Sequence, residues 1–189
     1  IREFIPTAPN QLWVSDITYI TLNNSFAYLS LITDAYSRKI VGFYLSKTLE
    51  AKGSIKALQM ALQYNPTLKN LIHHSDRGIQ YCCNDYVNYL NGCEMKISMT
   101  ENGDPYENAI AERVNGILKT EYGLDETFSN YLAANEAVKT AVYKYNNKRP
   151  HASCDYMTPV EAHTHKGELK KRWKKRKLKS ADNFIEMQR

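Results

Sequence analysis

The chain has 189 residues, 43% of them apolar, and a formal net charge of +5. This length and composition allow one substantial hydrophobic core with a terminal extension. No apolar run reaches the ~18 residues of a membrane-spanning helix, and no basic leader precedes an apolar stretch as in a signal peptide. Because the chain starts at Ile1 rather than Met, we expect it to be part of a longer protein.

The positive charge is concentrated near the C-terminus. Residues 166–179 hold nine basic residues and one acidic residue, which leaves 16 basic and 19 acidic residues elsewhere. Such a segment attracts phosphates and releases counterions on binding, although a solvated tail without a specific partner has the same composition. The four cysteines include an adjacent pair but no CxxC spacing, which favours free thiols in a cytoplasmic protein.

The first part of the chain predicts three consecutive strands. Residues 12–20, 26–33 and 38–45 are rich in β-branched and aromatic side chains. Asn23-Asn24 suits a tight turn between the first two, because Asn tolerates positive φ. Short links between successive strands favour an antiparallel meander.

The pattern then changes to helical spacing. Thr48 is the predicted N-cap of a helix that continues to about Tyr64, with Glu50 in its first turn. Asn65-Pro66 is expected to stop this helix.

The remaining elements alternate between strands and helices. Short strands are predicted at residues 68–74 and 94–98, and helices over 81–90, 105–122 and 129–147. The apolar side chains on or near one face of the last helix are Leu132, Val138, Val142 and Tyr145. This order of elements predicts an α/β domain with helices on the faces of a mixed sheet.

The helix over residues 105–122 is predicted to start with Pro105 and to be amphipathic at ~100° per residue. Its apolar stripe consists of Tyr106, Ile110, Val114, Ile117 and Leu118, and its polar face of Asn108, Glu112, Asn115 and Lys119. Ordinary surface helices also have a polar face. The helical periodicity alone is therefore also consistent with Glu112 being an ordinary solvent-exposed glutamate.

Two aspartates lie at positions that favour a site. Asp16 interrupts an apolar strand, where a buried carboxylate is costly unless it is paired or bound to a metal. Asp76 follows an apolar strand, and many α/β sites form at such carboxyl ends. The alternatives are a solvent-facing strand residue and a turn-forming aspartate, respectively. Phosphoryl transfer places charge on oxygen atoms, and carboxylates are the preferred ligands of Mg²⁺.

Six motifs occur in a fixed order: WVSDITYI, LITDAYSRKIVG, HHSDRGIQY, an Asn-Ala-x-Ala-Glu helix, YNNKRPH and MTPVEA. This set, from about Asn10 to Ala162, resembles the catalytic core of DDE transposases of bacterial insertion sequences, a core similar to that of retroviral integrases. Thirty-five residues separate Asp76 from Glu112, which also fits the family. The family usually has Asp-Asn-Ala where this chain has Glu107-Asn108-Ala109, so the resemblance assigns no role to Glu107.

The resemblance implies a ribonuclease H-like fold, with a five-stranded mixed sheet flanked by helices. It implies that Asp16, Asp76 and Glu112 are catalytic and bind two Mg²⁺ or Mn²⁺ ions. Water would attack DNA at the element ends, and the resulting 3′ hydroxyl would attack target DNA, with the protein self-associating on DNA. The expected divisions are a lead-in over residues 1–9, the core over 10–162 and a basic tail over 163–189.

Further residues are candidates for DNA contact or for structural roles. Lys119 is the strongest candidate, as a cation near a phosphate. Arg149 and His151 belong to the Arg-Pro-His text, with helix termination and packing as the alternative. His74 is expected to border the site or to be a structural histidine. The other predicted DNA contacts are Asn108, Asn115, Lys170, Lys171, Arg172, Lys174, Lys175 and Arg176.

Two apparent ligand sets are interpreted differently. Asp34 matches a structural strand-turn position of the family rather than a metal ligand. His73 and His74 are adjacent in a predicted strand, so they point to opposite faces and cannot easily share one ion. Two other functions remain open: a ribonuclease H-type nuclease that does not join strands, and an inactive core that binds DNA through the basic tail.

Overall fold

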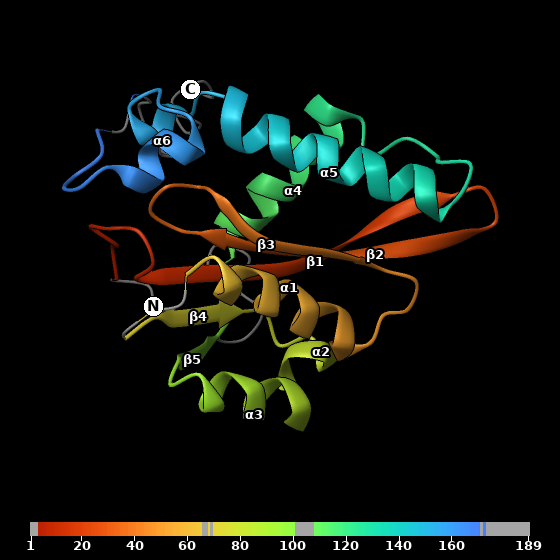
Figure 1. Ribbon diagram of the computed structural model, residues 1–189, viewed down its shortest axis with the longest axis horizontal. Coiled ribbons are helices and arrows are strands. Elements are labelled where there is room, and N and C mark those ends of the chain that lie inside the picture. Colours follow the sequence, from red (N-terminus) through yellow and green to blue (C-terminus); the bar gives the residue numbers. More distant parts are fainter. Residues whose placement is uncertain (1–3, 66–67, 69, 101–107, 171, 173–189) are drawn as a thin grey trace, which may run out of the picture.

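The computed structural model describes residues 4–65, 68, 70–100, 108–170 and 172. A five-stranded mixed sheet lies at its centre, with helices on both faces (Figure 1). The strands are β1 (Leu12–Leu22), β2 (Ser25–Asp34), β3 (Ile40–Ser46), β4 (Ile72–Ser75) and β5 (Lys96–Met99). Their spatial order is β3-β2-β1-β4-β5, which makes β1 the central strand. The predicted fold class is therefore confirmed.

The predicted meander is also confirmed. β1 pairs antiparallel with β2, and β2 pairs antiparallel with β3. β4 and β5 continue the sheet on the other side of β1 in parallel. Asn23-Asn24 forms the turn between β1 and β2, but neither residue has a positive φ. The location of that turn was predicted correctly, and its proposed backbone conformation was wrong.

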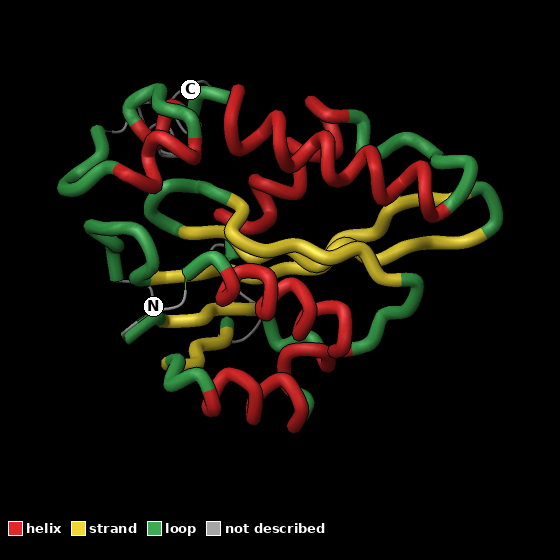
Figure 2. Tube along the Cα trace, in the orientation of Figure 1, coloured by secondary structure: helices red, strands yellow, loops and turns green. Residues whose placement is uncertain are grey.

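The helices divide between the two faces of the sheet (Figure 2). One face carries α1 (Ala51–Gln63), α2 (Ile79–Cys82) and α3 (Asn84–Gly92), and the other carries α4 (Ala109–Tyr122) and α5 (Tyr131–Lys148). A short 3-10 helix (Ala152–Cys154) and α6 (Pro159–Thr164) follow α5. No helix in the described ranges is long and apolar enough to cross a membrane.

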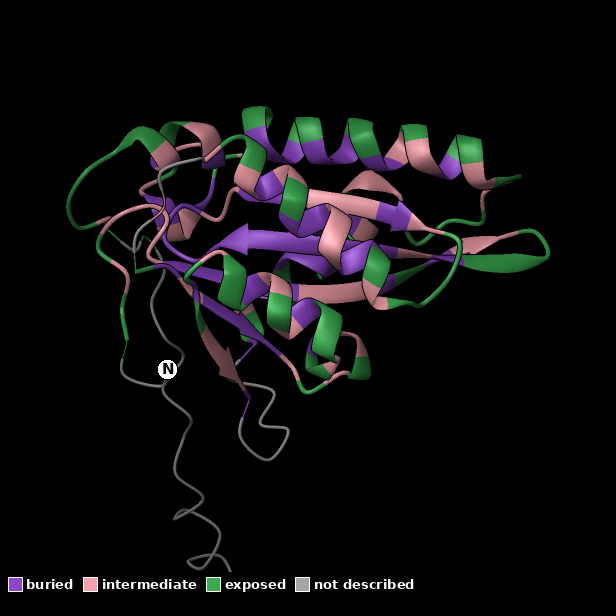
Figure 3. Cartoon of the chain, turned by 60° about the horizontal axis from the view of Figure 1, so that its bottom comes forward, coloured by how far each residue is buried: buried purple, intermediate pink, exposed green. Residues whose placement is uncertain are grey.

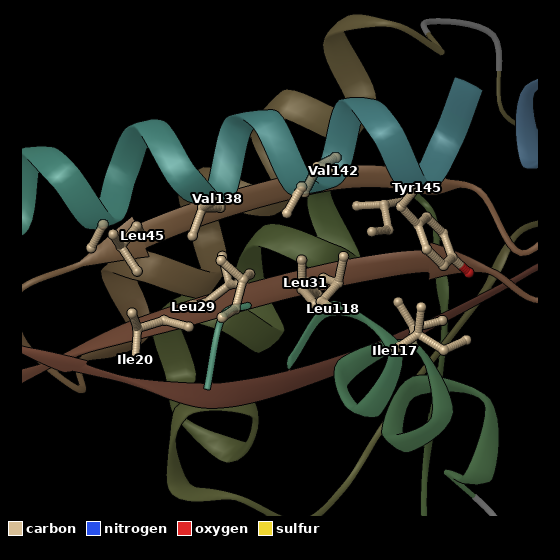
Figure 4. Close-up of a cluster of buried hydrophobic side chains, with 14 of the residues drawn as sticks. Ile20, Leu29, Leu31, Leu45, Ile117, Leu118, Val138, Val142 and Tyr145 are labelled. Carbon is tan, nitrogen blue, oxygen red and sulfur yellow. The ribbon is translucent and has the colours of Figure 1, made fainter. Parts of the chain in front are cut away.

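Each face of the sheet has its own hydrophobic core, because successive side chains of a strand point to opposite sides. On the α5 side, Val138 and Val142 pack with Leu29 and Leu31 of β2 (Figure 4). Trp13 of β1 belongs to the other core, which includes the helices α1 and α3. Figure 3 shows that buried residues line the sheet, whereas the outer side of α5 is exposed.

Helix α1 lies unusually close to β3 at Gly42. A Cβ atom at this position would lie 2.2 Å from the carbonyl oxygen of Ala57, closer than real Cβ contacts come. The backbone approach therefore requires glycine. Gly123 has a different role, because it ends α4 in the left-handed conformation with φ 71°.

Several predicted helix boundaries and faces were wrong. α1 begins at Ala51, and Glu50 takes the N-cap position in place of Thr48, whose backbone N–H bonds to Ser46 Oγ instead (3.3 Å). The predicted helix over 81–90 is interrupted at Cys83, which adopts an extended conformation. Leu132 is 73% exposed, because Ala134 and Val138 face the core. Pro105 and Tyr106 lie outside the described residues.

Candidate active site

Asp16 lies in the middle of β1 and faces the side of the sheet that α4 covers. Two residues earlier, Val14 packs with Ala111 of α4, which places the first turns of that helix over the central strand. One turn further along α4, Asn115 Nδ2 donates a hydrogen bond to Asp16 Oδ2 at 2.6 Å. The carboxylate is half-buried in this position. Asp16 therefore lies beneath α4 and is held by it.

Asp76 and Glu112 approach the same region from neighbouring elements. Asp76 is the first residue after β4, which runs parallel to β1 with Ser75 opposite Ser15. The backbone N–H of Gly78 donates to Asp76 Oδ1 at 2.9 Å and orients this carboxylate. Glu112 lies in the first turn of α4, next to Ala111, and is exposed.

The pKa of Asp16 shows that this carboxylate lies within electrostatic reach of two others. Burial is the main reason that this pKa rises from 3.8 to about 6. The negative charges of Asp76 and of Glu112 raise the pKa further, whereas hydrogen bonds from the Ile17 backbone and from Asn115 lower it. The fold thus brings Asp76 and Glu112, which are far from Asp16 in sequence, within electrostatic reach of it.

The carboxylates do not form a closed cage. Among the residues that the structure describes, no three His, Cys, Asp or Glu side chains are close enough together to hold a metal ion. Their chemistry nevertheless suits a hard cation, because all three offer oxygen ligands and Asp16 carries negative charge that is poorly compensated. The negative charge at this site thus favours a cation, although the three side chains do not converge on a single point.

Asn108 and Asn115 belong to the predicted polar face of α4, but both side chains are buried. The buried arc of α4 extends past the apolar stripe to Asn115 because Asp16 offers that amide a hydrogen-bond acceptor. Asn108 Nδ2 lies 3.4 Å from the carbonyl oxygen of Ser15. The side-chain oxygens of both amides are buried without a hydrogen-bond partner. They therefore leave two acceptors available beside Asp16.

The two histidines of β4 point to opposite faces, as predicted. His73 is buried with the α3 side, where its Nε2 lies 2.8 Å from Ser15 Oγ and 3.0 Å from Tyr86 OH. Burial lowers the pKa of His73 to about 3, so the ring is neutral. His74 is also buried, and its Nδ1 lies 3.1 Å from Ser98 Oγ.

Asp34 has the structural role that was predicted for it. Its side chain is fully buried at the end of β2. One carboxylate oxygen accepts the Asn10 N–H, and the other accepts the Ser37 N–H and hydroxyl, all at 2.7 Å. These bonds fix the turn that leads into β3.

The remaining candidates are dispersed. Lys119 lies half-buried in the last turn of α4, and Lys170 is exposed. Arg149 forms a two-pronged ion pair with Glu121, with both bonds at 2.6 Å. Arg172 pairs with Asp155. The residues Lys171, Lys174, Lys175 and Arg176 lie outside the described part of the chain.

His151 packs inside the protein rather than on a surface. It is 6% exposed, and its ring meets Tyr145 edge-on at 5.0 Å between centroids. Burial, reinforced by the charges of Arg149 and Arg38, lowers the pKa of His151 to about 4. These contacts agree with the packing alternative for the Arg-Pro-His text. A role of Arg149 in DNA binding stays a prediction.

The arrangement as a whole is that of a ribonuclease H-like fold with acidic residues on its central strand, at the end of the next strand and on a covering helix. Integrase core domain models match residues 6–105 and 93–159. The chain belongs to the integrase core domain family.

Relatives occur among proteins of bacterial insertion elements. The chain is 37% identical over 160 residues to the insertion element IS600 uncharacterized 31 kDa protein of Shigella sonnei, covering 84% of this chain and 59% of that protein. It is 34% identical over 165 residues to the transposase InsF for insertion sequence IS3A of Escherichia coli, covering 85% and 56%. It therefore spans somewhat over half the length of these relatives.

Solved structures confirm the fold. An intasome of simian T-cell lymphotropic virus, in complex with a PP2A regulatory subunit, matches with a TM-score of 0.74 and 21% identity, over 86% of this chain and 57% of that chain. The HTLV-2 integrase catalytic core domain in complex with magnesium matches with a TM-score of 0.67 and 20% identity, over 84% and 99%.

Proposed function

We propose that this chain is the catalytic core of an insertion-sequence transposase, which nicks DNA at the element ends and joins the 3′ hydroxyl to target DNA. The observation that carries this proposal is the electrostatic proximity of Asp76 and Glu112 to Asp16, because both negative charges raise the pKa of that carboxylate. The names of the relatives support the same reaction.

Asp16, Asp76 and Glu112 would hold two Mg²⁺ or Mn²⁺ ions, which stabilise the attacking and leaving oxygens of phosphodiester transfer when they are bound. The chain's own groups prepare for this. The amide of Asn115 orients Asp16, and the Gly78 N–H orients Asp76. Exposed Glu112 remains accessible at the edge of the site. Mutual repulsion among carboxylates favours a cation over an empty site.

DNA is the proposed substrate and partner. Lys119 extends from the last turn of α4, where a cation would contact a phosphate. Asn108, Arg149 and the basic residues from Lys170 onward would add contacts along the strand. We further propose that copies of the chain associate on paired DNA ends, and that the protein acts at the nucleoid in the bacterial cytoplasm.

The test is a strand-transfer assay with pre-cut element ends and Mg²⁺ or Mn²⁺, with the chain joined to the segment that its longer relatives carry. Asp16→Asn, Asp76→Asn and Glu112→Gln should each lower joining by about a hundredfold or more, by analogy with the loss of metal-site groups. Asp125→Asn, an exposed aspartate after α4, is the matched control and should retain full activity.

Calorimetry with Mn²⁺ separates the alternatives. Wild type should bind the ion, and Asp16→Asn should weaken this binding strongly. Hydrolysis of the DNA without any joined product would instead identify a nuclease. DNA binding with neither metal binding nor cleavage would identify an inactive core. Joining that persists in all three carboxylate variants would refute the site assignment.

A further inference from the structure

A cavity of about 550 Å³ opens on the side of α4 that faces away from Asp16. Its walls come from α4, from the end of α5 and from the segment around the 3-10 helix. Cavities of ~300–1,000 Å³ are typical of small-ligand sites. Nothing in the proposed reaction assigns this cavity a role.

Three guanidinium groups border the cavity: those of Arg38, Arg113 and Arg149. Arg38 lies largely within the protein, and burial lowers its pKa. Its donors reach the Ala35 carbonyl and Ser153 Oγ, which are both neutral groups. Within the described ranges, no carboxylate lies at ion-pair distance from Arg38 or Arg113, whereas Arg149 has Glu121 as a partner. Asp34 acts on Arg38 electrostatically but forms no ion pair with it. A sheltered cation whose hydrogen bonds go to neutral acceptors favours an incoming anion.

The other walls are apolar and aromatic. Ile110, Val114 and Ile117 line the α4 side, and the ring of Tyr145 lies at the end of α5. Tyr156 also borders the cavity, and it is 61% exposed although it is large and aromatic. Arginines provide phosphate contacts, and apolar or aromatic walls provide a surface on which a nucleobase stacks. Together they match the two halves of a nucleotide.

The cavity is adjacent to the proposed active site in the fold. Arg113 follows Glu112 directly on α4, and successive helix residues point ~100° apart. Glu112 therefore lies on the site side of the helix, and its neighbour Arg113 lines the cavity. A DNA strand with a phosphate near Glu112 could therefore place a neighbouring nucleotide near Arg113 by following the surface of α4.

We propose that this cavity binds one unpaired nucleotide of the DNA. Its phosphate would lie against Arg113 and Arg38, and its base against the apolar and aromatic part of the lining, which includes Tyr156. This inference rests on the proposed function only in taking DNA as the partner. It requires no metal and no catalysis, so it can be tested separately.

The experiment compares the affinity of the chain for two DNA duplexes in buffer with EDTA, measured by fluorescence anisotropy. One duplex is blunt, and the other carries a short single-stranded extension. Wild type should bind the extended duplex about five- to tenfold more tightly, as expected for one added stacking contact. Arg113→Glu and Tyr156→Ala should each reduce this ratio to about one.

Two matched controls lie on exposed positions of α5 outside the cavity, Lys144→Glu and Tyr143→Ala. Lys144→Glu reverses a positive charge as Arg113→Glu does, and Tyr143→Ala removes an aromatic ring as Tyr156→Ala does. Both controls should preserve the ratio of the two affinities even if overall affinity falls. Because the buffer contains EDTA, the metal-dependent reaction cannot contribute to the ratio, which distinguishes the cavity from the catalytic proposal. Equal binding of the two duplexes by wild type, or an unchanged ratio in Arg113→Glu and Tyr156→Ala, would overturn the proposal.

A competition arm distinguishes a DNA nucleotide from a free one. A deoxynucleoside monophosphate added in excess should leave the preference for the extended duplex in place, since the single nucleotide lacks the contacts of the attached duplex. Complete loss of the preference at micromolar nucleotide would overturn the assignment to a DNA strand and identify a free-nucleotide site.

Discussion

Asp16 is energetically unfavourable in the protein without a cation. Its carboxylate is half-buried, receives a single side-chain amide bond and lies within reach of two other negative charges. A residue of this kind lowers stability where it is ionised, and binding of a cation offsets that cost. A loss of stability of this kind is expected at a functional residue, and it is consistent with the metal-binding role proposed for Asp16.

This cost predicts a pH-dependent difference between wild type and Asp16→Asn. Because the folded-state pKa of Asp16 is about 6 and its ordinary value is 3.8, the native state binds more protons than the unfolded state between these values. The contribution of Asp16 to stability is therefore most favourable below about pH 4 and is lost as pH rises through 6. Asp16→Asn, which cannot ionise, should be more stable than metal-free wild type by on the order of 2 kcal/mol near neutral pH.

Urea denaturation at two pH values checks this expectation. The stability difference between Asp16→Asn and wild type should nearly vanish at about pH 4, where Asp16 is mostly protonated in the native state. Adding Mg²⁺ at neutral pH should stabilise wild type and leave the variant unchanged. If Asp16→Asn is less stable than metal-free wild type at neutral pH, the carboxylate is not destabilised there.

Individual site residues differed in how far the sequence could place them. Asp16 and Asp76 stood out in the sequence because each breaks a local pattern, a carboxylate in an apolar strand and another directly after one. Their roles as metal ligands stay predictions. Asn115 could not be placed, because its burial depends on the hydrogen bond to Asp16, 99 residues away in sequence. Arg38 and Arg113 gave no local signal, since the cavity between them forms only when α4 packs against the segments around it.

Among the elements, the strands followed the sequence most closely. Their β-branched and aromatic residues sit on a sheet that is buried on both faces, so local preference and tertiary packing agree. Helix ends were harder to place because they depend on contacts from outside the helix. α1 starts at Ala51 with Glu50 at its N-cap position, later than Thr48 predicts. Cys83 adopts an extended conformation that separates α2 from α3.

Replacing glycine by alanine should have opposite effects on stability in β3 and in α4. Gly42→Ala places a methyl group against the Ala57 carbonyl of α1, so it should cost about 3 kcal/mol or more by overpacking. Gly116→Ala lies on the exposed side of α4, where an added Cβ meets nothing within 4 Å, and should stabilise by about 0.5–1 kcal/mol.

Chemical denaturation of both variants, with unchanged m-values, measures these effects. Gly116→Ala serves as the control for the loss of glycine itself. A neutral Gly42→Ala would mean that α1 can move away from β3 without cost, which would contradict the tight contact between these elements.

At the scale of the whole molecule, the excess positive charge and the proposed active site lie in different parts of the chain. Outside residues 166–179 the chain has more acidic than basic residues, and the proposed site itself consists of carboxylates. Such a surface does not attract DNA over long distances. Under the proposed function, we therefore expect the basic segment near the C-terminus to provide the general attraction to DNA.

If the basic segment attracts DNA and the acidic core does not, the salt dependence of DNA binding should come mainly from the basic segment. The logarithm of the affinity falls with the logarithm of salt concentration by ~0.9 per neutralised phosphate of a duplex. Replacing Lys174, Lys175 and Arg176 together by Gln should reduce the slope by up to about 2.7. Replacing Lys52, Lys96 and Lys144, which are exposed on α1, β5 and α5, removes the same charge and should change the slope little. Equal slopes for the two triple variants would show that attraction comes from overall net charge, and the basic segment would then have no special part in holding DNA over the site.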